Sequence, residues 1–160
     1  MKDSEPALSV LVVDDDPDTA ESTAHLLYLC GYTARFALCG EDALRSAAAD
    51  PPDVVLLDLR MPDMDGFEVA RRLAALRAVK PPLVVALTGC EGAAERAGAA
   101  STGFHMHLVK PVEPAFLIGL MRRIRRAVAP VPPADRRAPE SDPAANRPGS
   151  FGSPRLATSD

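Results

Sequence analysis

The sequence predicts an α/β fold built around one parallel sheet, and two observations point to it. Five short, nearly continuous apolar runs recur along the first 129 of the 160 residues, as expected for strands that are buried on both faces. A segment with helical periodicity follows each run. Parallel strands joined by crossover helices form an open, doubly wound sheet, and the flavodoxin-like strand order 2-1-3-4-5 is the one we expect for five strands.

The first strand and helix carry the clearest boundary signals. Leu8–Val13 is the first strand, and Asp16 and Pro17 then provide the N-cap and the first position of a helix. Gly31 is the residue that ends this helix. The buried face of the helix is predicted from its spacing to consist of Ala20, Thr23, Ala24, Leu27 and Cys30.

The remaining elements follow from the same two periodicities. Strands are predicted at Thr33–Leu38, Val54–Leu57, Leu83–Leu87 and Met106–Val109, and helices at Glu41–Ala49, Phe67–Arg77, residues 91–101 and Phe116–Val128. The strand at Thr33–Leu38 is more polar than the others, so we place it at an edge of the sheet. Two glycines make the helix over residues 91–101 marginal. The last helix is predicted to bury Phe116, Leu117, Leu120, Ile124 and Val128.

Both ends of the chain lie outside the predicted domain, which comprises residues 8–129. Residues 1–7 form a short N-terminal extension. Residues 130–160 contain seven prolines and only three large apolar side chains, too few to offset the entropy of ordering, so we expect a disordered, proline-rich tail. This tail has four basic and four acidic residues, so the net charge of −4 belongs to the rest of the chain.

Composition argues against several classes of protein. No apolar run approaches the roughly 18 residues of a membrane-spanning helix, and the acidic N-terminus does not suit a signal peptide, so we expect a cytoplasmic protein without membrane insertion. The negative charge and the absence of tryptophan argue against a nucleic-acid partner. The three cysteines show neither a paired motif nor zinc-ligand spacing.

Carboxylates, a hydroxyl and an amine follow four of the predicted strands. The first strand is followed by Asp14 and Asp15, the third by Asp58, the fourth by Thr88 and the fifth by Lys110. The carboxyl ends of parallel strands share one edge of the sheet, where the sites of doubly wound folds form. Any one of these residues alone would more often be a turn former or a solvated side chain. Their coincidence at four strand ends predicts a functional site.

Clustered carboxylates favour a divalent cation. Two like charges about 4 Å apart repel by roughly 4 kcal/mol at an effective dielectric constant of about 20. Mg²⁺ removes this repulsion and prefers oxygen ligands. A carboxylate beside Mg²⁺ can also attack phosphorus to give an aspartyl phosphate, and an ammonium and a hydroxyl would stabilise the charged transition state. A calcium loop is excluded because Thr19 and His25 stand where that motif requires glycine and glutamate.

Four segments together resemble the receiver domain of two-component response regulators. VLVVDDDPD is similar to the first strand and acidic pair of that family, and VVLLDLRMPDMDGFE is similar to its phosphoacceptor strand and loop, with Asp58 as the acceptor. ALTG places Thr88 at the position of the switch hydroxyl, and HLVKPVEP places Lys110 at the position of the family's lysine. The resemblance covers about residues 8–128 and is greatest to receivers that stand alone or accompany hybrid kinases.

The resemblance implies a phosphoacceptor module of a two-component phosphorelay. A histidine kinase or a histidine phosphotransfer protein would donate a phosphoryl group to Asp58, with Mg²⁺ as the cofactor. Asp15, Asp58 and the backbone carbonyl of Arg60 would ligate the metal, and Asp14 would assist through water. Phosphorylation would then switch the binding of a partner protein.

The resemblance also implies which residues respond. Lys110 would pair with the phosphoryl group, and Thr88 would move to form a hydrogen bond with it. His107 stands where the family usually has tyrosine or phenylalanine, which makes it the second candidate switch residue. A neutral imidazole could follow Thr88 inward, whereas desolvation would oppose burial of a protonated one.

Two other functions stay open. An Mg²⁺-dependent phosphatase that acts through an aspartyl phosphate usually has a second acid two residues after its nucleophile, where this chain has Arg60. A scaffold that works without phosphorylation would not require the acids, Thr88 or Lys110. We therefore expect no enzyme activity beyond assistance to the chain's own phosphotransfer and dephosphorylation.

Overall fold

The computed structural model describes residues 7–76, 81–89 and 104–128. The predicted helix over residues 91–101 and the predicted tail over residues 130–160 lie outside this range, and the description concerns the compact unit formed by residues 1–127, with Val128 at the end of its last helix. Its elements are β1 (Ser9–Val13), α1 (Pro17–Leu29), β2 (Thr33–Ala37), α2 (Gly40–Ala49), β3 (Val54–Asp58), α3 (Gly66–Ala75), β4 (Leu83–Thr88), β5 (Met106–Val109) and α5 (Pro114–Val128).

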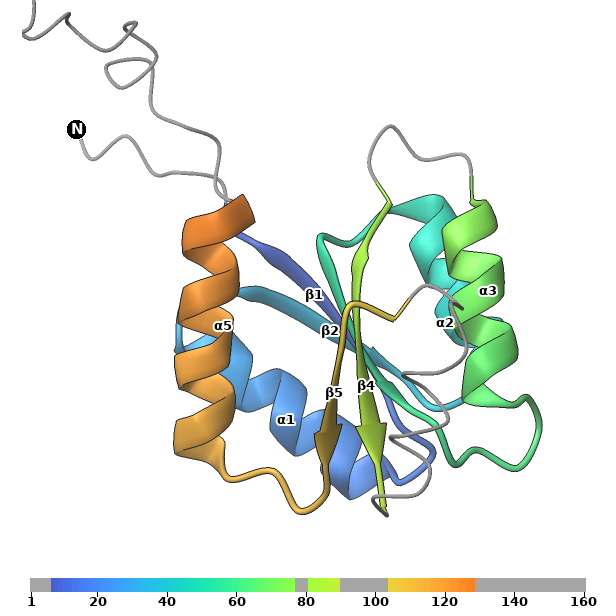
Figure 1. The fold of residues 1–160 in the computed structure, drawn as a ribbon, viewed down its shortest axis with the longest axis horizontal. Helices are drawn as coiled ribbons and strands as arrows, with labels where there is room; N and C mark the ends of the chain where they lie inside the picture. The colour runs from blue at the N-terminus through green and yellow to red at the C-terminus, as the bar shows by residue number, and fades with distance from the viewer. Residues whose placement is uncertain (1–6, 77–80, 90–103, 129–160) are drawn as a thin grey trace, which may run out of the picture. The chain divides into compact units, whose positions relative to one another are not determined.

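The five strands form one parallel sheet in the order β2-β1-β3-β4-β5, which confirms the predicted fold and strand order. Helices α1 and α5 cover one face of this sheet, and α2 and α3 cover the other (Figure 1). In the register, Val12 of β1 lies opposite Phe36 of β2 on one side and Leu56 of β3 on the other. Strand β2 is at an edge, as its polarity predicts.

Burial on both faces explains why the central strands are continuous apolar runs. Every residue of β3 is buried, and so are the last four residues of β1. On one face, Leu11 and Leu57 join a core cluster with Val69 and Leu73 of α3. Strands β3 and β4 each extend one residue beyond the predicted range, so Asp58 and Thr88 are the last residues of strands rather than the first residues of loops.

Helix α1 begins and ends as its sequence predicts. The Asp16 carboxylate accepts a hydrogen bond from the backbone N–H of Asp18, Pro17 is the first helical residue, and Gly31 adopts a φ of 92°, which favours glycine. Directly before β2, the Tyr32 side chain is buried. The Arg125 guanidinium of α5 lies over the Tyr32 ring, 5.9 Å from its centroid, and so ties α5 to the start of β2.

Helix α5 differs from its predicted buried stripe. Its buried residues are Leu117, Met121 and Ile124, and Phe116 is 59% exposed. The spacing of four and three residues between the buried positions defines a face that excludes position 116, which is rotated by about 100° from its neighbour Leu117. The prediction of a buried Phe116 was therefore wrong, because apolarity alone does not fix the rotation of a helix about its axis.

Gly66 should be required by the close approach of α3 to the end of β3. A Cβ at this position would lie 2.7 Å from Cα of Leu59, so we expect Gly66→Ala to lower the free energy of unfolding by about 1–3 kcal/mol. A Cβ at Gly119 in α5 would meet no atom within 4 Å, so Gly119→Ala should stabilise the protein by about 1 kcal/mol through helix propensity. Urea denaturation of both variants measures the difference, and equal effects would contradict it.

Candidate functional site

The carboxyl ends of the strands bring the predicted site residues together at one edge of the sheet. Asp14 directly follows β1, Asp58 and Thr88 end β3 and β4, and Lys110 directly follows β5. Asp14, Asp58 and Thr88 are nearly or fully buried, with exposed fractions of 2%, 5% and 0%. Buried polar residues at these positions are unusual for an apolar sheet, and they mark this edge as the candidate site.

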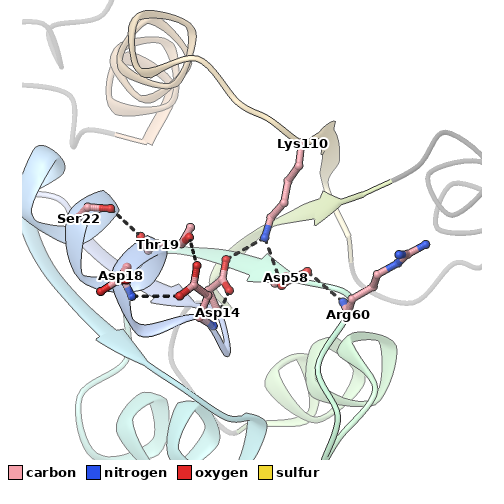
Figure 2. Close-up of polar contacts among 8 residues, drawn as sticks. Asp14, Asp18, Thr19, Ser22, Asp58, Arg60 and Lys110 are labelled. Atoms are coloured by element: carbon pink, nitrogen blue, oxygen red, sulfur yellow. Dashed lines mark hydrogen bonds and ion pairs between the residues drawn. The ribbon is translucent and has the colours of Figure 1, made fainter.

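The Lys110 ammonium lies between two buried carboxylates. Its Nζ is 2.8 Å from Oδ2 of Asp14 and 3.2 Å from Oδ2 of Asp58 (Figure 2). The backbone of the lysine is fixed as well, because its N–H donates a hydrogen bond of 2.6 Å to the carbonyl oxygen of Thr88. The side chain therefore reaches the site from a position set by the β4–β5 pairing.

Backbone N–H groups hold the other oxygen of each carboxylate. The Asp16 N–H donates to Oδ1 of Asp14, and the Arg60 N–H donates to Oδ1 of Asp58, each at 3.0 Å. Each donor lies two residues after the acid that it binds, so a local turn orients each carboxylate. Sequence reasoning missed both donors; the residues that follow each acid were the available signal.

Burial and charge act in opposite directions on the two ionisable partners. Burial of the Asp58 carboxyl raises its pKa and outweighs the Arg60 N–H and the Lys110 ammonium, which lower it. Burial alone would lower the pKa of Lys110, but the hydrogen bond to Asp14 and the charge of Asp58 raise it above its usual value. The half-buried lysine is therefore charged at neutral pH.

Asp15 completes a set of three carboxylates that suits a cation. Asp14, Asp15 and Asp58 each offer one oxygen atom, and these atoms lie within 4.8 Å of one another. One ammonium cannot neutralise three carboxylates, so the cluster keeps a negative charge. Asp15 is exposed, so the cluster can be reached from solvent. An all-oxygen, negatively charged and accessible set fits a hard divalent ion such as Mg²⁺.

Arg60, Thr88 and His107 occupy different parts of this region. The Arg60 backbone lies beside Asp58 through its N–H, and its side chain points away from the carboxylates (Figure 2). A metal-ligand role for its carbonyl stays a prediction. His107 is exposed on β5 and lines a groove of ≈ 360 Å³ with Phe116 of α5. It is separated by two residues from Lys110, and a switch role for it also stays a prediction.

A second groove, of ≈ 430 Å³, opens beside Lys110. Thr19 and Thr23 of α1 line one side, and Pro111 and Val112 line the other. Sequence reasoning missed these residues as parts of the site, although the spacing of the two threonines places both on one side of α1. Of the predicted site residues, only Lys110 is among those that line this groove.

Comparisons with known proteins agree with this geometry. Residues 10–122 match the family model of the response regulator receiver domain. The response regulators MprA of Mycolicibacterium vanbaalenii and Mycobacterium ulcerans are both 38% identical to this chain, over 76% and 75% of its length. These matches cover 52% and 51% of the relatives, so the chain spans about half the length of the curated relatives it matches.

Solved structures agree as well. The chemotaxis response regulator CheY4 of Vibrio cholerae is similar with a TM-score of 0.67 and 29% identity, over 74% of this chain and 98% of that one. A receiver domain from Methylobacillus flagellatus gives a TM-score of 0.64 and 28% identity over the same shares. Within the described residues, no helix has the combined length and apolarity needed to cross a membrane.

Asp58 should limit stability when no metal is bound. Because burial raises its pKa in the folded state, the folded protein binds more protons than the unfolded one between the usual and the raised value, and stability falls as the pH rises through that window. Asp58→Asn should remove this loss and raise the free energy of unfolding at pH 7 by about 1 kcal/mol. Thermal melts in a chelator from pH 3.5 to 7 measure the effect.

The matched control is Asp15→Asn, which removes an exposed carboxylate of the same cluster. It should change the free energy of unfolding much less than Asp58→Asn does. This interpretation would be contradicted if Asp58→Asn were less stable than the wild type at pH 7 without metal. The ion pair of the Asp58 carboxylate with Lys110 would then stabilise the folded protein by more than burial of that carboxylate destabilises it.

Proposed function

The chain belongs to the response regulator receiver domain family, and on that premise we propose that Asp58 accepts a phosphoryl group and thereby switches partner binding. The observation that supports this most directly is the position of the Asp58 carboxylate. It is buried at the end of β3, contacts the Lys110 ammonium, and shares an oxygen cluster with Asp14 and Asp15. An acceptor needs this combination of a fixed nucleophile and nearby positive charge.

The transfer follows from the orientation of Asp58. A carboxylate oxygen attacks the phosphorus of a phosphohistidine; the new P–O bond forms as the P–N bond breaks, and its electron pair stays on the imidazole nitrogen. Lys110 stabilises the phosphoryl oxygens, because its ammonium already lies 3.2 Å from the acceptor carboxylate. The Arg60 N–H holds Oδ1, which leaves Oδ2 as the oxygen on the side of the lysine.

Mg²⁺ would be held by the carboxylates of Asp14, Asp15 and Asp58. The backbone carbonyl of Arg60 would be a further ligand. When bound, the metal supplies positive charge that offsets both the clustered carboxylates and the incoming phosphoryl oxygens. The Lys110 ammonium would then no longer be the only positive charge beside the carboxylates of Asp14 and Asp58. Asp14 and Asp15 act as binding residues, and Asp58 remains the nucleophile.

The response to phosphorylation would begin at the end of β4. Thr88 is buried there, and its carbonyl oxygen accepts the Lys110 N–H, so a movement of either residue is shared by both strands. We propose Thr88 as the switch residue that binds the phosphoryl group. His107 lies in β5, three residues before Lys110, and is paired with Ala86 of β4. We propose it as the second switch residue, which would move inward with a neutral imidazole.

The partner that donates the phosphoryl group would be a histidine kinase or a histidine phosphotransfer protein. Because Asp15 of the carboxylate cluster is exposed, the phosphohistidine of this partner could approach the cluster from solvent. We further propose a cytoplasmic module that neither inserts into membranes nor binds nucleic acid, since its net charge of −4 disfavours a phosphate backbone. Phosphatase action and a scaffold independent of phosphorylation remain the alternatives.

Asp58→Asn should abolish phosphorylation. With Mg²⁺ and a small phosphodonor, the intact mass of the wild-type chain should increase by one phosphoryl group, because Asp58 is the single proposed acceptor. Asp63→Asn, which changes an exposed acid in the loop after β3, should be labelled like wild type. Labelling of Asp58→Asn to the same extent would disprove the assignment, and continuous release of phosphate from added phosphoesters would favour the phosphatase.

Magnesium affinity should depend on Asp15. Its removal leaves the ion with one carboxylate fewer, so calorimetric titration of Asp15→Asn should show a Kd at least about tenfold higher, or about 1.4 kcal/mol. Asp18→Asn removes an acid in the first turn of α1 that is not part of the cluster, and it should bind Mg²⁺ like wild type. Equal affinities of the wild type and Asp15→Asn would place the ion elsewhere.

A further inference from the structure

Exposed apolar side chains gather near one edge of the sheet, far in sequence from the site residues at the ends of β3, β4 and β5. Among the described residues six large apolar side chains are exposed, and four of them belong to the end of α1 and to β2 with the residue after it: Tyr28, Leu29, Phe36 and Leu38. The exposed fraction of Phe36 is 42% and that of Tyr28 is 66%. Such a concentration is typical of a surface that another molecule covers.

The backbone of β2 is open on the same side. Thr33 donates its N–H to Leu8, and Ala37 accepts from Asp14, so these two residues face β1. Because backbone groups alternate along a strand, Ala34 and Phe36 direct their N–H and C=O groups away from the sheet. No strand lies beyond β2 in the described part of the chain. Two residues therefore offer four hydrogen-bonding groups to an added strand.

A groove of ≈ 420 Å³ runs between α1 and this open edge. Ala24, His25 and Tyr28 line it from the helix, and Ala34 and Phe36 line it from the strand. A groove between an edge strand and a helix is the geometry that accepts an additional strand with one side chain inserted under the helix.

We propose that a second copy of this chain occupies the edge, with the two β2 strands antiparallel about a twofold axis. In this arrangement Ala34 of each copy lies opposite Phe36 of the other, and the pair exchanges its free N–H and C=O groups. The second copy's Phe36 enters the groove over the small Ala34 and beside Tyr28. A large side chain thus meets a small one, and the same contact forms twice.

Charge favours the antiparallel arrangement. Asp18 and Glu21 in α1 make one end of this edge acidic, since the helix begins near the end of β2. Arg125 lies over Tyr32 at the opposite end, and the charge of Arg122 also acts on the Tyr32 phenol. An antiparallel pair places the acidic end of each copy beside the basic end of the other.

The central pair of residues does not prevent this contact. Arg35 would lie opposite its counterpart in the second copy, on the other face of the sheet. Each Arg35 already forms an ion pair with Asp50, at 3.2 Å, and donates a hydrogen bond of 2.7 Å to the Ser46 hydroxyl. Two neutralised arginines therefore meet, rather than two free charges.

Sedimentation equilibrium of the full chain between about 1 µM and about 1 mM should reveal a monomer–dimer equilibrium. Phe36→Glu should raise the dissociation constant at least about tenfold. The matched control is Phe116→Glu, which makes the same change at an exposed phenylalanine of α5. It should leave the constant unchanged, and Asp58→Asn should also dimerise like wild type, which separates this inference from the phosphoacceptor role.

A charge exchange tests the orientation of the two strands. Glu21→Arg alone should weaken the dimer, because it places a positive charge beside the basic end of the other copy. Adding Arg122→Glu should restore the dimer, because the acidic and basic residues have then exchanged places in both copies. Amide hydrogen exchange needs no variant: the amides of Ala34 and Phe36 should slow with protein concentration, and those of Thr33 and Arg35 should not.

Two results would overturn the proposal. One is a monomer over the whole concentration range, which would leave the edge to an extended segment of a different protein. The other is a dimer that Phe116→Glu dissociates and Phe36→Glu does not.

Discussion

The ion cluster formed by the buried acids Asp14 and Asp58 with the half-buried Lys110 is the constraint on which the rest of this structure depends. A buried carboxylate is costly unless a cation or hydrogen bonds compensate for the lost water. Here the lysine lies 96 residues from Asp14 in sequence, so compensation requires that β1, β3 and β5 end at the same edge. A parallel sheet meets that requirement, and its crossover helices supply the apolar cover for both faces.

The surrounding elements keep the cluster in place without neutralising it. Local turns hold one oxygen of each acid through the N–H groups of Asp16 and Arg60, and the close approach of Gly66 to Leu59 fixes the backbone behind Asp58. One ammonium among three carboxylates leaves excess negative charge. The excess negative charge lowers the stability of the folded protein at this edge, and the proposed binding of a metal ion or a phosphoryl group would change that stability. Sensitivity to such ligands is the property that a signalling module needs.

Strong local signals made much of this predictable from the sequence. The apolar runs gave the strands, the polar run Thr33–Leu38 marked the edge, and Asp16, Pro17 and Gly31 marked the ends of α1. The convergence of the acids and the lysine followed from topology. The contribution of backbone N–H groups did not, because every residue type carries one. The exposure of Phe116 was also mispredicted, since the rotation of α5 depends on packing that no local pattern records.

The contact between Tyr32 and Arg125 has an optical consequence. The chain contains two tyrosines and no tryptophan, so tyrosine alone dominates its near-ultraviolet emission. Tyr32 is 4% exposed beneath a guanidinium, whereas Tyr28 is 66% exposed. A water-soluble quencher reaches the second ring and not the first. The protected fraction of the emission therefore reports, without any label, whether α5 remains seated against the start of β2.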